Sequence, residues 1–521
     1  MKNDTLTVAI SKTEYETLKS ENAELKQKVS WLMEQFRLSQ HRRFGASSEK
    51  SDYDQLNMFN EAEAFSDKNA AAPELALIER HYRKRKRLAS DRLPDDLPVE
   101  VIEYKLPEDE QDCPKCNGNL HVMKHNVRRE LVFIPATAKI REHIEYVYAC
   151  RDCEQNSDNV PIIKARMPEP VIFKSFASPE AVAHIIYQKF VMHSPLYRQE
   201  QDWNRYGIML SRQTMSNWLI RATEDWLEPI YNRLHKLLIA RNVLHADETT
   251  LQVLHEPGKT AQSKSYMWLY RTSGDVENPI VLYEYQSGRH AKYPEAFLKN
   301  FTGFLHADGY DGYHKLPDNI VVVGCWAHLR RKFDEALKSL PKERQESPLA
   351  AEGLDWCNKL FHLEKQFVPL TPKERQEERE RLSKPVMDDF FAWVDSLAVL
   401  PKSLLGKAVH YAQSQRKYLQ RYLLDGRLEI SNNRAERSIK PFVIGRKNFL
   451  FANTPRGATA SAIMFSIIET AKENGLNPFA YLNYIFKTAP NLAVADLVSA
   501  ESLLPWSSEL PEGVRRSSLA S

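Results

Sequence analysis

The chain has 521 residues, of which 42% are hydrophobic and 27% are charged, and its formal net charge is +3. This length predicts roughly three or four domains, and the nearly balanced charge means that a nucleic-acid partner must be argued from local clusters of cations. Since the chain has no run of about 18 apolar residues and no apolar signal segment at its start, we expect a cytoplasmic protein without a membrane partner.

The first predicted element is a helix over residues 15–36, within an N-terminal segment of residues 1–50. Leu18, Leu25 and Leu32 recur every seven residues, and Asn22 occupies the alternating seam position. Leucines on one seam position and a single Asn on the other are typical of parallel two-stranded coiled coils. We favour a short dimerisation zipper, although an ordinary amphipathic helix fits three heptads equally well.

A polar linker is predicted over residues 51–100, and it carries a cluster of cations at 81–87. One interpretation is that Arg83, Arg85 and Arg87 contact DNA phosphates, which adds affinity but no sequence specificity. The alternative is a basic loop that only contacts solvent.

Two C-x-x-C pairs lie in the next predicted domain, residues 101–170. Cys113 with Cys116, and Cys150 with Cys153, can together supply four thiolates to one structural Zn²⁺ ion. The residues between the pairs, 131–134 and 140–149, predict a β-hairpin that would bring them together. A redox role is the alternative, but two such pairs around a hairpin favour a closed zinc site that serves folding or docking.

Residues 171–240 are predicted to be helical. Ser178, followed by Pro and Glu, begins one helix; Gly207 ends another at 196–206, and Ser211 caps the start of a third. Helix, Gly-containing turn and helix fit a DNA-binding helix-turn-helix, although other helical bundles show the same spacing. The polar residues of the last helix that would contact DNA are Arg212, Gln213 and Asn217.

A repeated tetrapeptide, Leu-His-Ala-Asp, ends two strand-like runs at residues 244–247 and 305–308. Alternate side chains of a strand share a face, so in each copy the His and the Asp point the same way. If the two strands are neighbours, Asp247 and Asp308 converge, and their repulsion favours a cation between them. Mg²⁺ prefers such oxygen ligands. The alternative is that both aspartates only end strands and begin turns.

The order of the remaining elements predicts the fold of this domain. Strands are expected at 265–271 and 280–285, a helix at 291–300 and a further strand at 320–324. Three strands, a helix and more strands are the order of a ribonuclease-H-like fold, with acidic residues on the first and fourth strands. The predicted core occupies residues 241–340 and 426–490, separated by a helical insertion at 341–425 and followed by a C-terminal tail at 491–521.

The chain is therefore predicted to be a multidomain α+β protein. Its ribonuclease-H-like mixed α/β core with a helical insertion follows a coiled-coil helix, a four-Cys zinc ribbon-like domain and a helix-turn-helix bundle.

A late acidic residue, Glu436, is expected in a short helix that Ser431 or Asn432 caps and Pro441 ends. Glu436 is either a structural salt-bridge partner or a metal ligand beside phosphate-binding cations. Cys325 and His328 form a C-x-x-H pair, for which a packed Cys and a hydrogen-bonding His are favoured over half of a zinc site. The cations near these motifs are Arg330, Arg331, Arg434, Arg437, Lys440, Arg446 and Lys447.

These motifs together resemble the bacterial transposases of the insertion sequence 66 family. The resemblance is carried by residues 247–249, 308–313, 325–333, 432–441 and 445–448, and it extends to residues 44–50, the four cysteines and residues 503–506. It implies a DDE transposase whose catalytic triad is Asp247, Asp308 and Glu436. In such enzymes two Mg²⁺ ions about 4 Å apart, for which Mn²⁺ can substitute, support strand cleavage and strand transfer.

The resemblance also implies partners. The first is double-stranded DNA, both as the ends of the element and as the target. The others are further copies of the chain, in a homodimer or higher oligomer, and helper proteins of the same element. The protein is expected to associate with the nucleoid. The seven cations named above would hold DNA phosphates. The alternative function is a catalytically inactive DNA-binding regulator, or a domesticated transposase, built on the same ribonuclease-H-like body.

Overall fold

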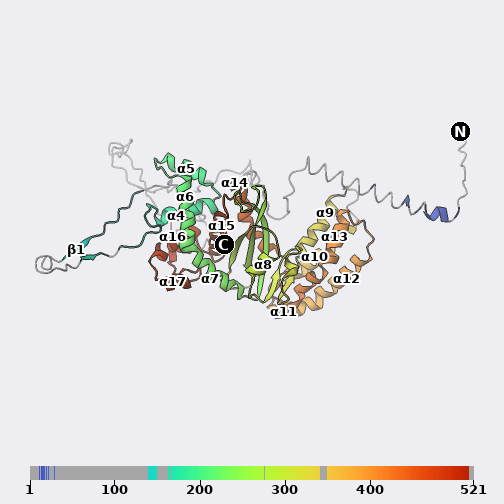
Figure 1. Cartoon of the computed structure of the whole chain (residues 1–521). Coiled ribbons are helices and arrows are strands. Elements are labelled where there is room, and N and C mark those ends of the chain that lie inside the picture. Colours follow the sequence, from blue (N-terminus) through green and yellow to red (C-terminus); the bar gives the residue numbers. More distant parts are fainter. Residues whose placement is uncertain are drawn as a thin grey trace, which may run out of the picture. The chain divides into compact units, whose positions relative to one another are not determined.

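A computed structural model describes residues 167–274, 276–340 and 349–515, together with short pieces at 139–149, at 162–165 and within 11–29. The chain divides into two units, residues 1–46 with 143–516 and residues 47–142 with 517–521. Nearly all described residues belong to the first unit, whose elements are labelled in Figure 1.

The centre of the first unit is a five-stranded mixed sheet in the order β5-β4-β3-β6-β7 (Figure 1). The first three strands pair antiparallel, whereas β3, β6 and β7 pair parallel. The two Leu-His-Ala-Asp strands are β3 and β6, so the condition under which Asp247 and Asp308 converge, that these strands are neighbours, is met. The strands are β3 (Val243–Gln252), β4 (Lys264–Thr272), β5 (Val281–Gln286), β6 (Gly303–His306) and β7 (Ile320–Val323).

Helix α15 (Pro455–Glu473) covers the edge of the sheet at β5. Ser466 Oγ accepts the backbone N–H of Tyr283 at 2.7 Å, and Thr470 Oγ1 accepts that of Val281 at 3.0 Å. Backbone groups at a sheet edge otherwise remain open to pairing with another chain. Two hydroxyl groups of one helix thus accept hydrogen bonds from backbone N–H groups of this edge strand.

Upstream of the sheet lie four helices, α4 (Pro179–Phe190), α5 (Leu196–Arg205), α6 (Arg212–Ala222) and α7 (Glu228–Ile239). Both expected N-caps are confirmed: Ser178 Oγ accepts the N–H of Ala181 at 3.1 Å, and Ser211 Oγ accepts that of Thr214 at 3.2 Å. Gly207 follows α5 with φ +74°, which favours glycine. The predicted helix, turn and helix are therefore present.

A second hydrophobic core lies beyond β7. It joins Val323 and Trp326 to the helices that follow, with Phe333, Phe390 and Leu419 fully buried. The described residues 349–420 are largely helical, as expected. The helices from β5 onward to this point are α8 (Lys292–Phe297), α9 (Trp326–Lys338), α10 (Leu349–Phe367), α11 (Pro372–Glu378), α12 (Lys384–Ser396) and α13 (Leu404–Gln420).

Helix α14 (Asn433–Phe449) contradicts the prediction that Pro441 ends a short helix, because Pro441 lies inside it. A proline removes one helical hydrogen bond. Ile439 and Phe442, on either side of Pro441, are buried in the main core, the larger hydrophobic cluster around the sheet, and the free energy gained by their burial outweighs that loss. Asn432 is the N-cap residue, one of the two predicted positions, but its side chain makes no capping hydrogen bond.

The C-terminal residues pack onto the main core. Helices α16 (Pro478–Thr488) and α17 (Val494–Ser499) are followed by Leu503 and Leu504, which are buried in this core. Trp506 is partly buried and packs against the same core. Within the described residues, no helix has the length and apolar character that a membrane crossing requires.

Several predicted sites lie outside the described residues. They are the four cysteines (Cys113, Cys116, Cys150 and Cys153), the cations Arg83, Arg85 and Arg87, and most of the heptad helix. Near them, β1 (Val147–Ala149) pairs antiparallel with β2 (Ile162–Lys164). In the N-terminal helix, residues 13–17 are helical, and Tyr15 is 56% exposed.

Candidate active site

The register of β3 against β6 aligns the two copies of the repeated tetrapeptide. Leu244 pairs with Leu305, and His245 pairs with His306. Asp247 and Asp308 follow the paired histidines by two residues in each copy. Because parallel neighbours run in the same direction, the two carboxylates lie at the same level, just beyond the end of β6 and midway along β3. The prediction that Asp247 ends its strand is wrong, because β3 continues to Gln252 through its pairing with β4.

The carboxyl group of Asp247 is in a site that resists its ionisation. Burial raises its pKa well above the usual range, and the negative charges of Glu248, Asp308 and Glu436 add to this effect. One carboxyl oxygen accepts the N–H of Glu248 at 2.8 Å, which opposes the rise. Repelling carboxylates of this kind are relieved by a bound cation, so this site fits a divalent ion with oxygen ligands.

Asp308 begins a tight turn after β6. Its Oδ1 accepts the N–H of Tyr310 at 2.9 Å, a local bond that Asp commonly makes at the start of a turn. Gly309 is required next, because a Cβ atom there would lie 2.8 Å from the ring of Tyr411. The turn therefore fixes the Asp308 carboxylate, and turn formation and a metal-binding role are compatible.

Glu436 lies in the first turn of α14, with its side chain 25% exposed. Its Oε2 is 3.1 Å from Nη2 of Arg331, and its Oε1 is 3.6 Å from Nδ1 of His328. The negative charge of Glu436 contributes to the raised pKa of Asp247. Neither Asp247 nor Asp308, however, belongs to the compact group of possible metal ligands that includes Glu436. In the described part of the chain, the His, Cys, Asp and Glu side chains whose ligand atoms all lie within 4.8 Å of one another are Cys325, His328 and Glu436.

The start of α14 is fastened to the sheet by Asn432, which is 1% exposed. Its Nδ2 donates to the carbonyl oxygen of Ala246 at 2.8 Å, which leaves Oδ1 to accept from Nδ1 of His245 at 2.9 Å. Its backbone N–H donates to Cys325 Sγ at 3.2 Å. Asn432 therefore sets where Glu436 lies relative to Asp247, a role that the sequence analysis missed.

The two histidines of the repeat support the same segment. Their rings stack with centroids 4.4 Å apart, and Nε2 of His306 accepts the backbone N–H of Glu429 at 3.1 Å. Burial lowers the pKa of His245 to about 3, so its ring is neutral. The repetition of His in the tetrapeptide was the signal that could have indicated this positioning role.

Replacing Asn432 with Ala is expected to destabilise the protein by about 1–3 kcal/mol, because the His245 N–H and the Ala246 carbonyl lose their buried partner. Denaturant unfolding measures this change. The control is Asn448→Ala on the same helix, where the side chain makes one exposed bond and the expected change is within about 0.5 kcal/mol. Equal effects of the two substitutions would contradict the role of Asn432.

Two nearby acids, Glu248 and Asp311, have surroundings unlike those of the predicted metal ligands. The Glu248 side chain is 1% exposed and is held by Arg289, whose Nε donates at 2.7 Å, and by Tyr313, whose hydroxyl donates at 2.6 Å. Asp311 is 82% exposed in the turn after Asp308. Glu248 is thus committed to partners in the protein, and Asp311 points to solvent.

The predicted DNA-contacting cations divide into two groups. Arg330, Arg331, Arg434 and Arg446 bond within the protein: to Asn358 at 2.7 Å, to Glu436, to Glu429 at 2.6 Å, and to Thr249 and Thr250 of β3, respectively. The other group, Arg437, Lys440 and Lys447, is exposed on α14, and its two lysines also interact with other residues of the protein. In the upstream bundle, Arg212, Gln213 and Asn217 lie in the first half of α6, where Gln213 Nε2 donates to Asn217 Oδ1 at 3.2 Å.

Comparison with known families identifies the chain. The family described as "Transposase IS66 family" matches residues 174–460, more than half of the chain. The mixed sheet with its aligned aspartates, together with this match, defines the chain as a transposase. More particularly, the chain belongs to the IS66 family. Three further models match: "Transposase C of IS166 homeodomain" at 31–102, "zinc-finger binding domain of transposase IS66" at 110–154, and "IS66 C-terminal element" at 466–506.

Similar proteins from Sinorhizobium fredii (strain NBRC 101917 / NGR234) cover most of the chain. "Uncharacterized protein y4jD" is 31% identical over 429 residues, 80% of this chain and 81% of the relative. "Uncharacterized protein y4hP" is 30% identical over 440 residues, 81% of this chain and 77% of the relative. The zinc-finger match contains all four cysteines of the predicted zinc site.

Proposed function

We propose that this transposase is a DDE enzyme that binds the ends of its element, cleaves DNA strands and joins them to target DNA. The observation that carries the proposal is the register that pairs His245 with His306, because it puts Asp247 and Asp308 at the same level of two neighbouring strands. The strand order also agrees with a ribonuclease-H-like core that has one acid on its first strand, β3, and one directly after its fourth strand, β6.

Asp247, Asp308 and Glu436 are the proposed ligands of the catalytic metal ions. When bound, Mg²⁺ ions polarise the scissile phosphate and favour deprotonation of the attacking water or 3′-hydroxyl. The raised pKa of Asp247 supports this assignment, since the crowded negative charges that raise it match a divalent cation. Asn432 keeps the first turn of α14 against the sheet, and Arg331 orients one oxygen of Glu436.

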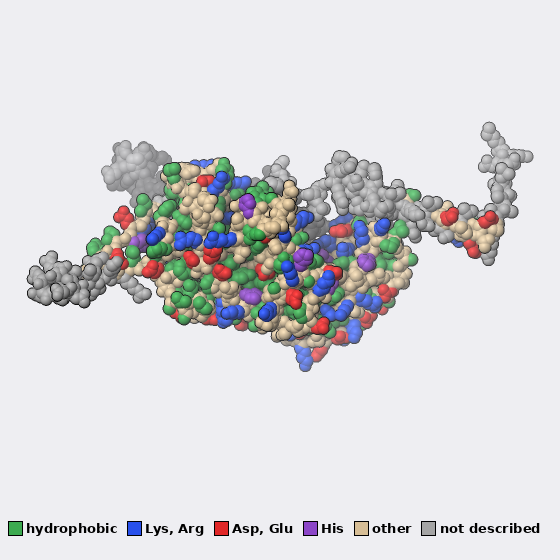
Figure 2. Space-filling view, viewed as in Figure 1, with side chains coloured by type: hydrophobic (Ala, Val, Ile, Leu, Met, Phe, Trp, Pro, Cys, Tyr) green, Lys and Arg blue, Asp and Glu red, His purple; other side chains and the backbone are tan. Residues whose placement is uncertain are grey.

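DNA phosphates are proposed to contact the exposed cations of α14. Arg437, Lys440 and Lys447 are spaced by three and seven residues, so they follow one face of the helix that also bears Glu436. On the face of the molecule in Figure 2, Lys and Arg side chains are interspersed with Asp and Glu. A local stripe rather than a large positive field therefore supports this interface.

Replacing Arg437 and Lys440 together with Gln is expected to weaken DNA binding about uniformly across sequences. Each lost phosphate contact should reduce the slope of log affinity against log salt by about 0.9. Fluorescence anisotropy at several salt concentrations measures the slope. Lys365→Gln, at an exposed position of α10, is the control and should leave it unchanged. An unaltered slope in the double variant would remove this stripe from the interface.

The remaining modules complete the proposal. Arg212, Gln213 and Asn217 of α6 are proposed to contact DNA bases, as the second helix of a helix-turn-helix does. Cys113, Cys116, Cys150 and Cys153 are proposed to hold one structural Zn²⁺. Two element ends require at least a dimer, for which the heptad helix is suited, and helper proteins of the element are further proposed partners on the nucleoid.

Cleavage by the purified full-length chain tests the function. Labelled duplexes carrying the ends that flank this gene are incubated with protein and Mg²⁺, and the products are separated on denaturing gels. We expect nicks at the element ends and joined products, both abolished by EDTA. End binding without any cleavage would instead favour the second candidate, a DNA-binding regulator.

A further inference from the structure

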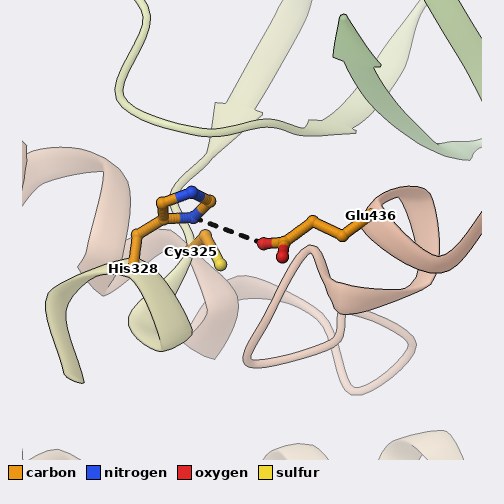
Figure 3. Close-up of side chains that lie close together, drawn as sticks. All are labelled: Cys325, His328 and Glu436. Atoms are coloured by element: carbon orange, nitrogen blue, oxygen red, sulfur yellow. Dashed lines mark ion pairs between the residues drawn. The ribbon is translucent and has the colours of Figure 1, made fainter. Parts of the chain in front are cut away.

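A mixed set of ligand atoms surrounds one side of Glu436. Cys325 immediately precedes α9, His328 lies in the first turn of α9, and Glu436 lies in the first turn of α14. Their side chains point toward one another, as Figure 3 shows, and their ligand atoms all lie within 4.8 Å of one another. Two segments that are more than 100 residues apart in the chain thus contribute sulfur, nitrogen and oxygen to one point.

The gap between His328 and Glu436 has the size of a metal-bridged contact. Nδ1 and Oε1 are 3.6 Å apart, too far for a good hydrogen bond. Both atoms are buried, and neither has a hydrogen-bond partner among the described residues. Two ligands bound to tetrahedral zinc at about 2.0–2.1 Å lie about 3.3 Å apart. A small rotation of either side chain closes the difference.

The sulfur of Cys325 is surrounded by backbone donors. Its Sγ accepts the N–H of Asn432 at 3.2 Å, and the N–H groups of Ala327 and His328 at the start of α9 also act on it. Burial raises the pKa of the Cys325 thiol to about 12, and these donors act against that rise without cancelling it. Binding of a metal ion would displace the proton, because Cys binds metals as the thiolate. In this fully buried position, the N–H of Asn432 would then be a hydrogen-bond partner of the metal-bound sulfur.

The chemistry of the three ligands selects the metal. A thiolate is a soft ligand that Mg²⁺ does not use, whereas thiolate, imidazole and carboxylate together suit Zn²⁺. Three protein ligands leave a fourth position open to water or to a phosphate oxygen. The site thus differs in kind from the all-oxygen site proposed at Asp247 and Asp308.

We propose that Cys325, His328 and Glu436 bind one Zn²⁺ ion, separate from the four-Cys domain, and that this ion withholds Glu436 from the catalytic metal ions. The second half of the proposal depends on the proposed function, because it needs Glu436 to serve as a catalytic ligand. Zinc would then act as an inhibitor of a magnesium-dependent enzyme. Arg331, which holds the other oxygen of Glu436 at 3.1 Å, stabilises the carboxylate in this position.

Zinc content tests the first half. Full-length protein is reloaded with Zn²⁺, dialysed and measured by plasma mass spectrometry. We expect two zinc ions per chain in the natural protein, one in Cys325→Ser, and two in the control Cys357→Ser, which changes the other buried free cysteine. Equal zinc content in the natural protein and Cys325→Ser would overturn the site.

A second variant leaves the new site intact and guards against misfolding at Cys325. Replacing Cys113 and Cys116 with Ser removes thiolates of the four-Cys domain only. We expect this variant to retain one zinc ion per chain, and to lose it when His328 is also replaced with Ala. A double Cys variant that retains no zinc would overturn the proposal.

Inhibition by zinc tests the second half. In the magnesium-dependent cleavage assay, Zn²⁺ is titrated and each protein is compared with its own zinc-free rate. Half-inhibition of Cys325→Ser should require a zinc concentration higher by at least about 10–100-fold, the range by which even outer-shell changes alter metal affinity. Zinc that binds without inhibiting would overturn the competition. Failure of the natural protein to cleave at all would overturn the proposed function. The number of zinc ions bound per chain would still test the zinc site, because it is measured without cleavage.

Discussion

Replacing Asp308 with Asn is expected to abolish magnesium-dependent cleavage while leaving DNA-end binding intact. The amide can still accept the N–H of Tyr310 that shapes the turn, but it carries no charge for a cation. Losing one metal ligand removes several kcal/mol of transition-state stabilisation, and each 1.4 kcal/mol is about a factor of ten in rate, so we expect a loss of about a thousandfold or more.

Cleavage and binding are measured on the same duplexes, by gel analysis and by anisotropy. The matched control is Asp311→Asn, which changes an acid that is three residues further along and 82% exposed, and whose rate should stay within about twofold of the natural protein. Retained cleavage in Asp308→Asn would remove this residue from the metal site. Loss in both variants would indicate a disturbed turn rather than a lost ligand.

The sequence was sufficient to predict the part of the site that depends on neighbouring strands. Two copies of Leu-His-Ala-Asp on neighbouring strands need only parallel pairing to align, and the register of Leu244 with Leu305 provides it. The predicted end of the first strand at Asp247 is wrong, because β3 continues to Gln252. Local signals also gave the N-caps at Ser178 and Ser211, because a cap bond joins residues only three apart. The zinc-binding and DNA-binding assignments of the other modules stay predictions.

Contacts between residues that are far apart in the chain could not be predicted from the sequence. Asn432 was expected to cap its own helix, yet its amide bonds to β3, 186 or more residues away. Pro441 was expected to end α14, yet burial against the sheet carries the helix through it. In both cases a tertiary contact outweighed a local preference. Likewise, Cys325 and His328 form a recognisable pair, but only the fold adds Glu436 to them.

The helical region at 349–420 is expected to depend on one buried arginine, Arg379, which is 1% exposed. Its guanidinium binds both oxygens of Glu364, at 2.8 and 2.6 Å. It also donates to the carbonyl oxygens of Tyr422, Asp425 and Leu428. These carbonyls belong to the segment that leads to Asn432 and Glu436, so Arg379 connects the second core to the approach of the candidate active site.

Replacing Arg379 with Ala is expected to cost about 3–5 kcal/mol of unfolding free energy, because Glu364, whose side chain is only 13% exposed, and three backbone carbonyls would lose their charged partner. Denaturant unfolding gives the value. Arg379→Lys should also destabilise, since an ammonium group cannot reproduce the planar fork that serves Glu364 and the carbonyls together. The control is Arg381→Ala, two residues along, where a 65% exposed side chain pairs with Glu378 and no measurable change is expected. If Arg379→Ala unfolds at the same denaturant concentration as this control, the arginine does not hold the segment that leads to α14.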